Sequence, residues 1–299
     1  MDRALTSSSR PEVIDIIVVA YRNDIFLLEL QARSISLYFP QERIGNIYIC
    51  VNDEDHYCTD INLDWWGENK TKVKIIARSN FGSDPSLDGW RSQQLYKLLL
   101  ANQAKSNWSL CLDSKTCFVQ KLNWNTLFDQ SGRVNFKHLP TINAFLSAQY
   151  FIEEYFQISC PQVLGPGGVP FMFHTTTVNS MVSEIPDFFN FFCQNAKSPN
   201  ELTEFMLYTG FVLYKYGNFD ELYTDNQYYS IFNLADFQVK DFDKTWSWTT
   251  QPNLLTASVQ ERAYLHLSNK QFDIWVDFLQ NKNLLTKDDT IVQKLNTLR

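Results

Sequence analysis

Apolar residues in the first 120 positions occur in short uninterrupted runs. The first run covers 13–20 and contains one polar residue, Asp15. Such runs are typical of strands that are buried on both faces of a parallel sheet. The same pattern predicts three further strands, at 47–51, 73–77 and 108–112.

Two longer segments between these strands have the spacing of amphipathic helices. After the first strand, apolar residues recur every three or four positions up to Phe39, and Pro40 ends the pattern. Before the fourth strand, Asp88 is expected to cap a helix that carries Leu95 and Leu98. Strands that alternate with helices predict an α/β fold with an open, mostly parallel twisted sheet flanked by helices.

The second half of the chain has a less regular pattern. Residues 144–156 are apolar and aromatic, and they fit either a helix or a strand. The other expected elements are a loop at 165–170, a short strand at 171–174, helices at 178–185 and 202–216, and a helical C-terminal region from about residue 273.

Composition and charge exclude several classes of protein. The 299 residues are 44% hydrophobic and 20% charged, which is a normal globular balance. The net charge of −7 argues against a partner such as nucleic acid, whose binding requires a basic surface. The apolar runs are shorter than the roughly 20 residues that span a bilayer. We therefore expect neither a nucleic-acid partner nor a membrane span.

The N-terminal residues and the cysteines indicate a cytoplasmic protein. Residues 1–12 lack the apolar stretch of a secretory signal and are expected to be a disordered leader. The six cysteines form no CxxC pair, which excludes a zinc ribbon and fits reduced, mostly buried thiols.

Polar residues follow three of the predicted strands, at 21–24, 52–55 and 113–115. Ligands of open α/β sheets bind beyond the carboxyl ends of the strands, so these segments are the candidate site. No glycine-rich phosphate motif follows the first strand. The sequence therefore argues against a dinucleotide dehydrogenase and a P-loop enzyme.

Asp113 and the preceding helix are the main candidates for binding an anionic ligand. A carboxylate at this edge can hold a divalent ion against a diphosphate, or it can simply cap a turn. On the helix, Arg91, Gln94 and Lys97 follow one another at three-residue steps. They offer a guanidinium group, an amide and an ammonium group. The alternative is an ordinary solvated helix face.

Several ordered motifs resemble one uncharacterised family. The helix reads Gly-Trp-Arg-x-Gln-x-x-x-Lys-Leu over 89–98, and it lies between the first strand and the strand that ends at Asp113. Two later segments, Pro-Phe-Met-Phe-His at 170–174 and Thr-Glu-Phe-Met-Leu-Tyr-Thr-Gly at 203–210, complete the set. Together, over about residues 13–216, they resemble a bacterial and phage glycosyltransferase-like family (DUF6492 type) related to the GT-A glycosyltransferases.

The resemblance implies a domain organisation and a reaction. It implies a GT-A-like catalytic domain at 13–270, with a nucleotide-sugar half at 13–120 and an acceptor half at 121–270, followed by a C-terminal helical segment at 271–299. The implied function is glycosyl transfer from a nucleotide-diphosphate sugar to a carbohydrate acceptor, as in carbohydrate biosynthesis.

The resemblance also implies roles for single residues. Tyr21 and Asp24 would contact the donor base, and Asp113 would stand at the first position of an Asp-x-Asp motif that binds Mn²⁺ or Mg²⁺. The other implied roles are acceptor binding by Gly168 and His174, general-base catalysis by Glu204, and late metal ligation by His266, for which a plain surface histidine is the alternative.

The chain departs from the Asp-x-Asp pattern at one position. Lys115 stands where the second carboxylate is expected, which leaves the metal requirement open, and its ammonium group can itself neutralise a diphosphate. The alternative function is a non-catalytic nucleotide- or glycan-binding protein on the same fold. A nucleotidyltransferase is disfavoured, because no glycine-rich, lysine-containing loop follows the first strand.

Overall fold

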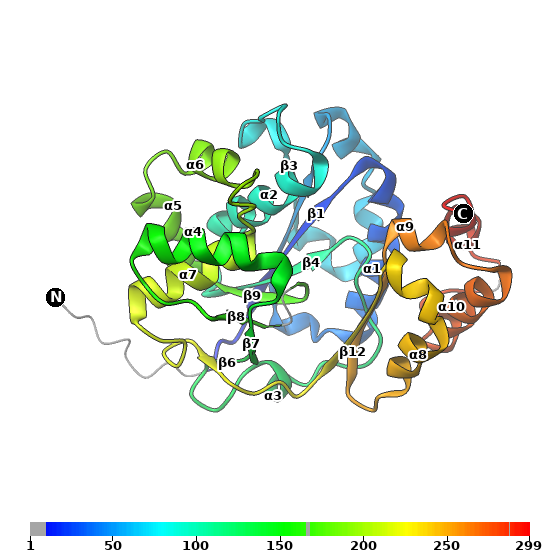
Figure 1. Ribbon diagram of the computed structural model, residues 1–299. Helices are drawn as coiled ribbons and strands as arrows, with labels where there is room; N and C mark the ends of the chain where they lie inside the picture. The colour runs from blue at the N-terminus through cyan, green and yellow to red at the C-terminus, as the bar shows by residue number, and fades with distance from the viewer. Residues whose placement is uncertain (1–9, 166–167, 287) are drawn as a thin grey trace.

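The computed structural model describes residues 10–165, 168–286 and 288–299. A five-stranded sheet in the order β3-β2-β1-β4-β9 forms its centre (Figure 1). The first four strands run parallel, and β9 pairs antiparallel with β4 at the edge. The bounds of these strands are β1 Ile14–Ala20, β2 Ile44–Val51, β3 Val73–Ala77, β4 Trp108–Asp113 and β9 Phe171–His174.

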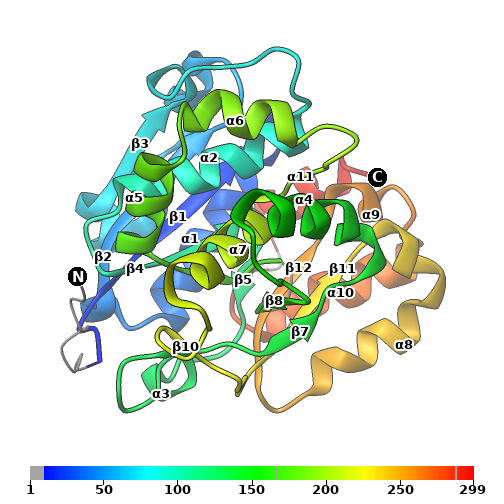
Figure 2. The same cartoon turned by 60° about the vertical axis from the view of Figure 1, so that its left-hand side comes forward.

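Helices cover both faces of this sheet. Helix α1 (Ile25–Tyr38) connects β1 to β2, and α2 (Gly89–Gln103) connects β3 to β4. Because β2 and β4 lie on opposite sides of β1, right-handed crossovers place the two helices on opposite faces. Figure 2 shows α2 beneath a layer of further helices. This layer contains α4 Leu146–Phe156, α5 Thr175–Glu184, α6 Phe188–Asn195 and α7 Glu204–Tyr216.

A second, smaller core lies on the other side of α1. It surrounds a sheet in the order β11-β12-β5 and includes Leu27 and Leu30 of α1, whereas Leu28 and Ile35 of the same helix belong to the main core. The C-terminal helices pack into this second core, so residues 271–299 share it with β12. Its elements are β5 Cys117–Phe118, β11 Ser230–Leu234, β12 Leu254–Val259, α8 Phe242–Trp246, α9 Glu261–Tyr264, α10 Asn269–Asn281 and α11 Thr290–Asn296.

Short elements complete the fold. Two strand pairs, β6 (Val134–Asn135) with β10 (Tyr223–Thr224) and β7 (His138–Pro140) with β8 (Gln162–Leu164), lie near α3 (Trp124–Leu127). The 3-10 helices are Arg22–Asp24, Gln41–Arg43, Asp55–Asp60, Leu63–Lys72, Arg78–Asn80, Asn143–Phe145, Asp236–Asp241 and Ser247–Thr250.

Asp15, the polar residue within the first apolar run, connects neighbouring strands through hydrogen bonds. Its carboxylate is fully buried and accepts hydrogen bonds from the backbone amides of Asn46, Lys105 and Ser106 at 2.6, 2.6 and 2.8 Å. It therefore links β1 to the starts of β2 and β4. A Cβ atom at Gly45 would lie 2.4 Å from the same carboxylate, so this position requires glycine.

Most of the predicted elements are confirmed. The four strands and both helices of the first half are present, and the Asp88 side chain accepts from the amide of Arg91 at 2.8 Å as the expected cap. The ambiguous segment 144–156 is helical, and Gly217 ends α7 in the left-handed conformation. The small sheet β11-β12-β5 was missed, because β11 and β12 carry polar residues among their apolar ones and β5 has only two residues.

Two other predicted regions lie partly outside the described residues. Of the expected leader at 1–12, residues 1–9 are not described, whereas the carbonyl of Pro11 accepts from Trp124 Nε1 at 3.0 Å. Of the loop at 165–170, residues 166–167 are not described. Among the described residues, no helix is both long and apolar enough to cross a membrane.

Candidate functional site

The three polar strand ends meet at the carboxyl edge of the main sheet. β1 lies between β2 and β4, so these parallel strands end side by side. Nε of Arg22 lies 3.5 Å from Oδ2 of Asp53, and the hydroxyl of Ser114 donates to Asp24 at 3.4 Å. The segments 21–24, 52–55 and 113–115 therefore lie together at one edge of the sheet, and they remain the candidate site.

Lys97 of α2 is the centre of a buried group of charges. Its Nζ lies 2.9 Å from Oδ1 of Asp113 and 3.1 Å from Oε1 of Glu204, the first residue of α7. The side chains of Lys97 and Glu204 are 7% and 4% exposed. Burial alone would lower the pKa of Lys97, but the two carboxylates outweigh it and raise that pKa. Lys97 therefore stays charged and holds both carboxylates in place.

Lys115 pairs with the other oxygen of Asp113. Its Nζ lies 3.4 Å from Oδ2, and its side chain is 22% exposed. Burial alone would raise the pKa of Asp113, but the ammonium groups of Lys97 and Lys115 outweigh it and hold that pKa well below its usual range. We call Lys97, Asp113, Lys115 and Glu204 the lysine–carboxylate cluster. Burial raises the pKa of Glu204, although Lys97 acts against the rise. Lys115 is the most exposed member of the cluster.

Asp24 lies beside this cluster at the end of β1. Its Oδ1 atom is buried, and no described residue donates a hydrogen bond to it. Burial raises the pKa of Asp24 to about 6, with Lys115 acting against the rise and Glu261 adding to it. A carboxyl group with such a pKa can exchange a proton near neutral pH.

Arg22 joins two aromatic side chains at the same edge. Its guanidinium carbon lies 5.6 Å from the ring centre of Tyr21 and 5.9 Å from that of Tyr57. Two aromatic rings and a guanidinium group, with Asp53 beside it, offer faces on which a heterocycle can stack. Tyr21 was predicted to contact the donor, whereas Arg22 and Tyr57 were not, although Arg22 belongs to the polar segment that follows the first strand.

Arg91 and Gln94 have different surroundings from Lys97 on the same helix. Nε of Arg91 donates to the carbonyl of Ala196 at 2.7 Å, and Nη1 lies 2.7 Å from Asp88. These contacts hold the start of α2 against the end of α6. The Gln94 side chain is buried, and neither atom of its amide has a hydrogen-bond partner among the described residues. Gln94 is therefore the better of the two candidates for a ligand contact.

His174 lies at the wrong edge of the sheet for its expected acceptor role. β9 runs antiparallel to β4, so His174 pairs with Trp108, the first residue of β4, whereas Asp113 is the last. Five residues of strand separate the two positions by roughly 16 Å. His174 is buried, its ring nitrogen Nδ1 is 2.9 Å from Thr177 Oγ1, and burial lowers its pKa to about 4.

Gly168 lies on the side of the sheet where a ligand would be expected. It precedes the start of β9, whose first residue, Phe171, pairs with Cys111 near the carboxyl end of β4. A Cβ atom at Gly168 would meet no atom within 4 Å, so open space adjoins it.

Comparison with known proteins identifies the family. A family model described as a family of unknown function (DUF6492) matches residues 13–275. The chain belongs to DUF6492. No curated protein matches it significantly.

Solved structures share the fold of this DUF6492 chain. It is similar to the galactosyltransferase LgtC in complex with donor and acceptor sugar analogues, with 12% identity, a TM-score of 0.50, and 94% of this chain and 100% of LgtC covered. An active-site mutant of LgtC gives a TM-score of 0.54 at the same identity and coverage. Mouse xyloside xylosyltransferase 1 is 8% identical, with a TM-score of 0.44 and coverage of 82% and 97%. The DUF6492 chain therefore has the GT-A glycosyltransferase fold.

Asp113 and His266, the expected metal ligands, have different surroundings in the structure. Both carboxylate oxygens of Asp113 face lysine ammonium groups, so a divalent ion would have to displace at least one of them. His266 is exposed beyond α9. Within the part of the chain that the structure describes, no three or more His, Cys, Asp and Glu side chains gather as metal ligands would.

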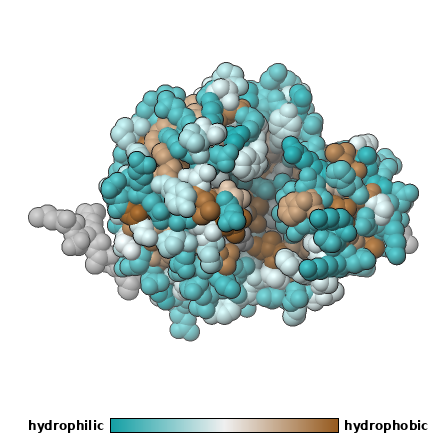
Figure 3. Space-filling model, viewed as in Figure 1, coloured by the Kyte–Doolittle hydropathy of each residue, from teal (hydrophilic) through white to brown (hydrophobic). Residues whose placement is uncertain are grey.

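The surface is hollowed next to this edge. Figure 3 shows a depression between the part of the DUF6492 chain built on α4 and α7 and the part built on β12, α9 and α10, with apolar side chains in its depth. Next to the C-terminal helices, a cavity of about 580 Å³ is lined by Asn23, which follows β1, and by Glu261 and Leu265 at α9, among others. This cavity borders the end of β1 at Asn23, whereas Asp24, Asp113 and Lys115 do not line it.

Proposed function

We propose that this chain is a glycosyltransferase that moves a sugar from a nucleotide-diphosphate donor to a carbohydrate acceptor. The observation that carries the proposal is the position of Lys115. On a GT-A fold, it presents an ammonium group beside Asp113 at the sheet edge, where the motif of the resemblance expects a metal-binding carboxylate. A diphosphate carries the charge that such a group attracts.

The donor is proposed to extend along the carboxyl edge from β2 to β4. Its base would stack at Tyr21, Arg22 and Tyr57, where the guanidinium group lies close to both rings. Its diphosphate would lie at Lys115. A negative leaving group that forms as the sugar departs would then be stabilised by this ammonium group, which Asp113 already holds in position.

Asp113 and Lys97 are proposed to act through Lys115. Asp113 touches both lysines, and Lys97 fixes it from the buried side. Lys115 is thereby prevented from turning into solvent, which lowers the entropic cost of binding the diphosphate.

The acceptor is proposed to enter through the hollow next to Gly168 and Asp24. An acceptor hydroxyl needs a base within hydrogen-bond reach. Asp24 is half-buried with a pKa of about 6 and an unpaired oxygen, whereas the carboxylate of Glu204 is buried against Lys97. We therefore assign Glu204 to positioning Lys97, and the base role expected for it from the sequence becomes the alternative.

A panel of nucleoside diphosphates and nucleotide sugars tests the proposed function. One of UDP, GDP, ADP and CDP is expected to raise the melting temperature, and the corresponding nucleotide sugar is expected to be hydrolysed slowly. Asp113→Asn should lower both effects and still fold. If no diphosphate binds, the proposal is wrong.

A non-catalytic binding protein is the second candidate function. The observation that favours it is the replacement of a motif carboxylate by Lys115. Binding of a diphosphate without hydrolysis or transfer of any of the corresponding nucleotide sugars would support it.

A further inference from the structure

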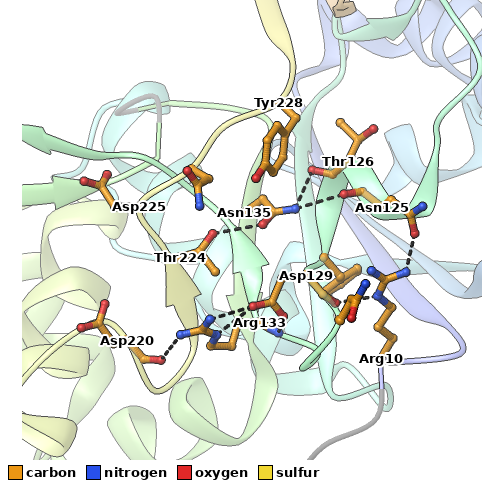
Figure 4. A pocket seen from close by; sticks show the side chains of 13 residues that line it. Arg10, Asn125, Thr126, Asp129, Arg133, Asn135, Asp220, Thr224, Asp225 and Tyr228 are labelled. Carbon is orange, nitrogen blue, oxygen red and sulfur yellow. Dashed lines mark hydrogen bonds and ion pairs between the residues drawn. The ribbon is translucent and has the colours of Figure 1, made fainter.

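A second cavity lies away from the carboxyl edge, between α3, β6 and the chain that follows β10 (Figure 4). Its volume is about 650 Å³, within the range of small-molecule sites. Phe128 lines it and packs against Trp108, the first residue of β4, with ring centres 6.0 Å apart. Asp113 ends the same strand, roughly 16 Å further along. This cavity is therefore separate from the proposed donor site.

The floor of this cavity is a fixed polar surface. Asn135 is 1% exposed, its amide donates to the carbonyls of Asn125 and Thr126 at 3.1 and 3.3 Å, and its oxygen accepts from Thr224 at 3.0 Å. These bonds use the amide of Asn135 fully but leave the oxygen of the Thr224 hydroxyl able to accept. The floor is thus rigid and offers a hydroxyl group to a ligand.

The charges around the cavity compensate one another. Arg133 pairs with Asp129, with Nη2 2.8 Å from Oδ2, and its Nη1 donates to the carbonyl of Asp220 at 3.3 Å. Arg10 donates to the carbonyl of Asp129 at 2.6 Å and also to the side chain of Asn125. Both guanidinium groups are therefore occupied. Asp220 and Asp225 also line the cavity, and the Asp225 carboxylate accepts from the backbone amide of His138 at 2.8 Å. With Asp129, the lining holds three carboxylates against two guanidinium groups, which disfavours an anionic ligand.

The rim combines an aromatic ring with hydrogen-bonding groups. Tyr228 is 57% exposed, and Figure 4 shows its ring reaching from the chain after β10 toward Asn135 and Thr224. Asn226 and Gln130 add amides, which both donate and accept. An aromatic face packs against the C–H face of a pyranose ring, while paired donors and acceptors match its hydroxyl groups.

We propose that this cavity binds an uncharged saccharide unit, remote from the carboxyl edge. A ligand of this class uses the aromatic face, the amides and the carboxylates at once, and it brings no charge to a site that already holds two guanidinium groups and three carboxylates. On a glycosyltransferase, such a site would hold a distant part of a glycan chain. The binding itself does not depend on the proposed transferase function.

Saturation-transfer NMR of the full chain with lactose, maltose and cellobiose at millimolar concentration tests the site. At least one of the three is expected to bind, and Tyr228→Ala is expected to weaken that binding about tenfold or more. Trp248→Ala is the matched control, because Trp248 is 54% exposed and lines neither described cavity. This variant should bind the disaccharide as the parent does.

A variant of the other site separates this inference from the proposed function. If disaccharide binding is lost in Asp113→Asn and retained in Tyr228→Ala, the sugar occupies the carboxyl edge and the inference is wrong. Absence of binding by all three disaccharides also overturns it. Nucleoside diphosphate binding should be the same in Tyr228→Ala as in the parent, whichever outcome is found for the disaccharides.

Discussion

The ammonium nitrogen of Lys97 lies 2.9 Å from Oδ1 of Asp113, and this contact joins the middle of α2 to the last residue of β4. The pair leaves only Oδ2 of Asp113 facing the open side, where Lys115 meets it. A carboxylate held between two ammonium groups is a positioning group for the outer lysine. The chemistry of the edge therefore depends on Lys115.

Diphosphate binding is expected to need Lys115 and not a divalent ion. The nucleoside diphosphate that stabilises the parent should bind equally well in EDTA and in Mn²⁺, measured by calorimetry. Lys115→Ala should weaken it by about 1.5 to 3 kcal/mol, the usual contribution of a hydrogen bond to a charged group. Lys121→Ala, an exposed lysine nearby in sequence, is the control. Loss of binding by the parent in EDTA would disprove this prediction.

Replacing Glu204 distinguishes a positioning role from a base role. Glu204→Gln should lower the free energy of unfolding by about 1 to 3 kcal/mol, because Lys97 loses one of its two buried partners. Diphosphate affinity should change by no more than a few-fold, since Asp113 still holds Lys97. Chemical denaturation measures the first effect and calorimetry the second.

The control for Glu204 is Glu201→Gln, three residues earlier, where the side chain is 50% exposed. This variant should be as stable as the parent. A Glu204→Gln protein that keeps the parent's stability but loses transfer by about a hundredfold would instead establish Glu204 as the base.

Stability between pH 4 and pH 7 is expected to depend on Asp24. Its folded-state pKa of about 6 lies above the ordinary value of 3.8, so its protonation favours the folded state. This contribution is complete below pH 3.8 and is lost as the pH rises through 6. Asp24→Asn should therefore be more stable than the parent at pH 7, by at most about 3 kcal/mol, and equal to it near pH 4.

Urea unfolding at both pH values measures this difference. Asp60→Asn, at an exposed position, should show the same pH dependence as the parent. If Asp24→Asn also follows the parent from pH 4 to pH 7, the carboxyl group is ionised throughout, and Asp24 loses its place as the proposed base.

Local pattern determined the first half of the fold and the place of the site. Continuous apolar runs require strands buried on both faces, so β1 to β4 followed from the sequence, as did the polar segments after three of them. The family and its fold were identified from ordered motifs such as the one at 89–98. The segment 144–156 could not be assigned, because a short apolar run satisfies both periodicities.

Only the tertiary structure decided which candidate residues meet. The direction of β9 is set by its pairing with β4, and it moved His174 to the opposite edge from Asp113. Lys97 and Glu204 are separated by 107 residues and form an ion pair because α2 and α7 pack together. The spacing of residues along the chain determines which of them share a helix face or a strand end. Long-range packing determines which charged side chains pair with each other. That pairing distinguishes a lysine–carboxylate cluster from a metal site.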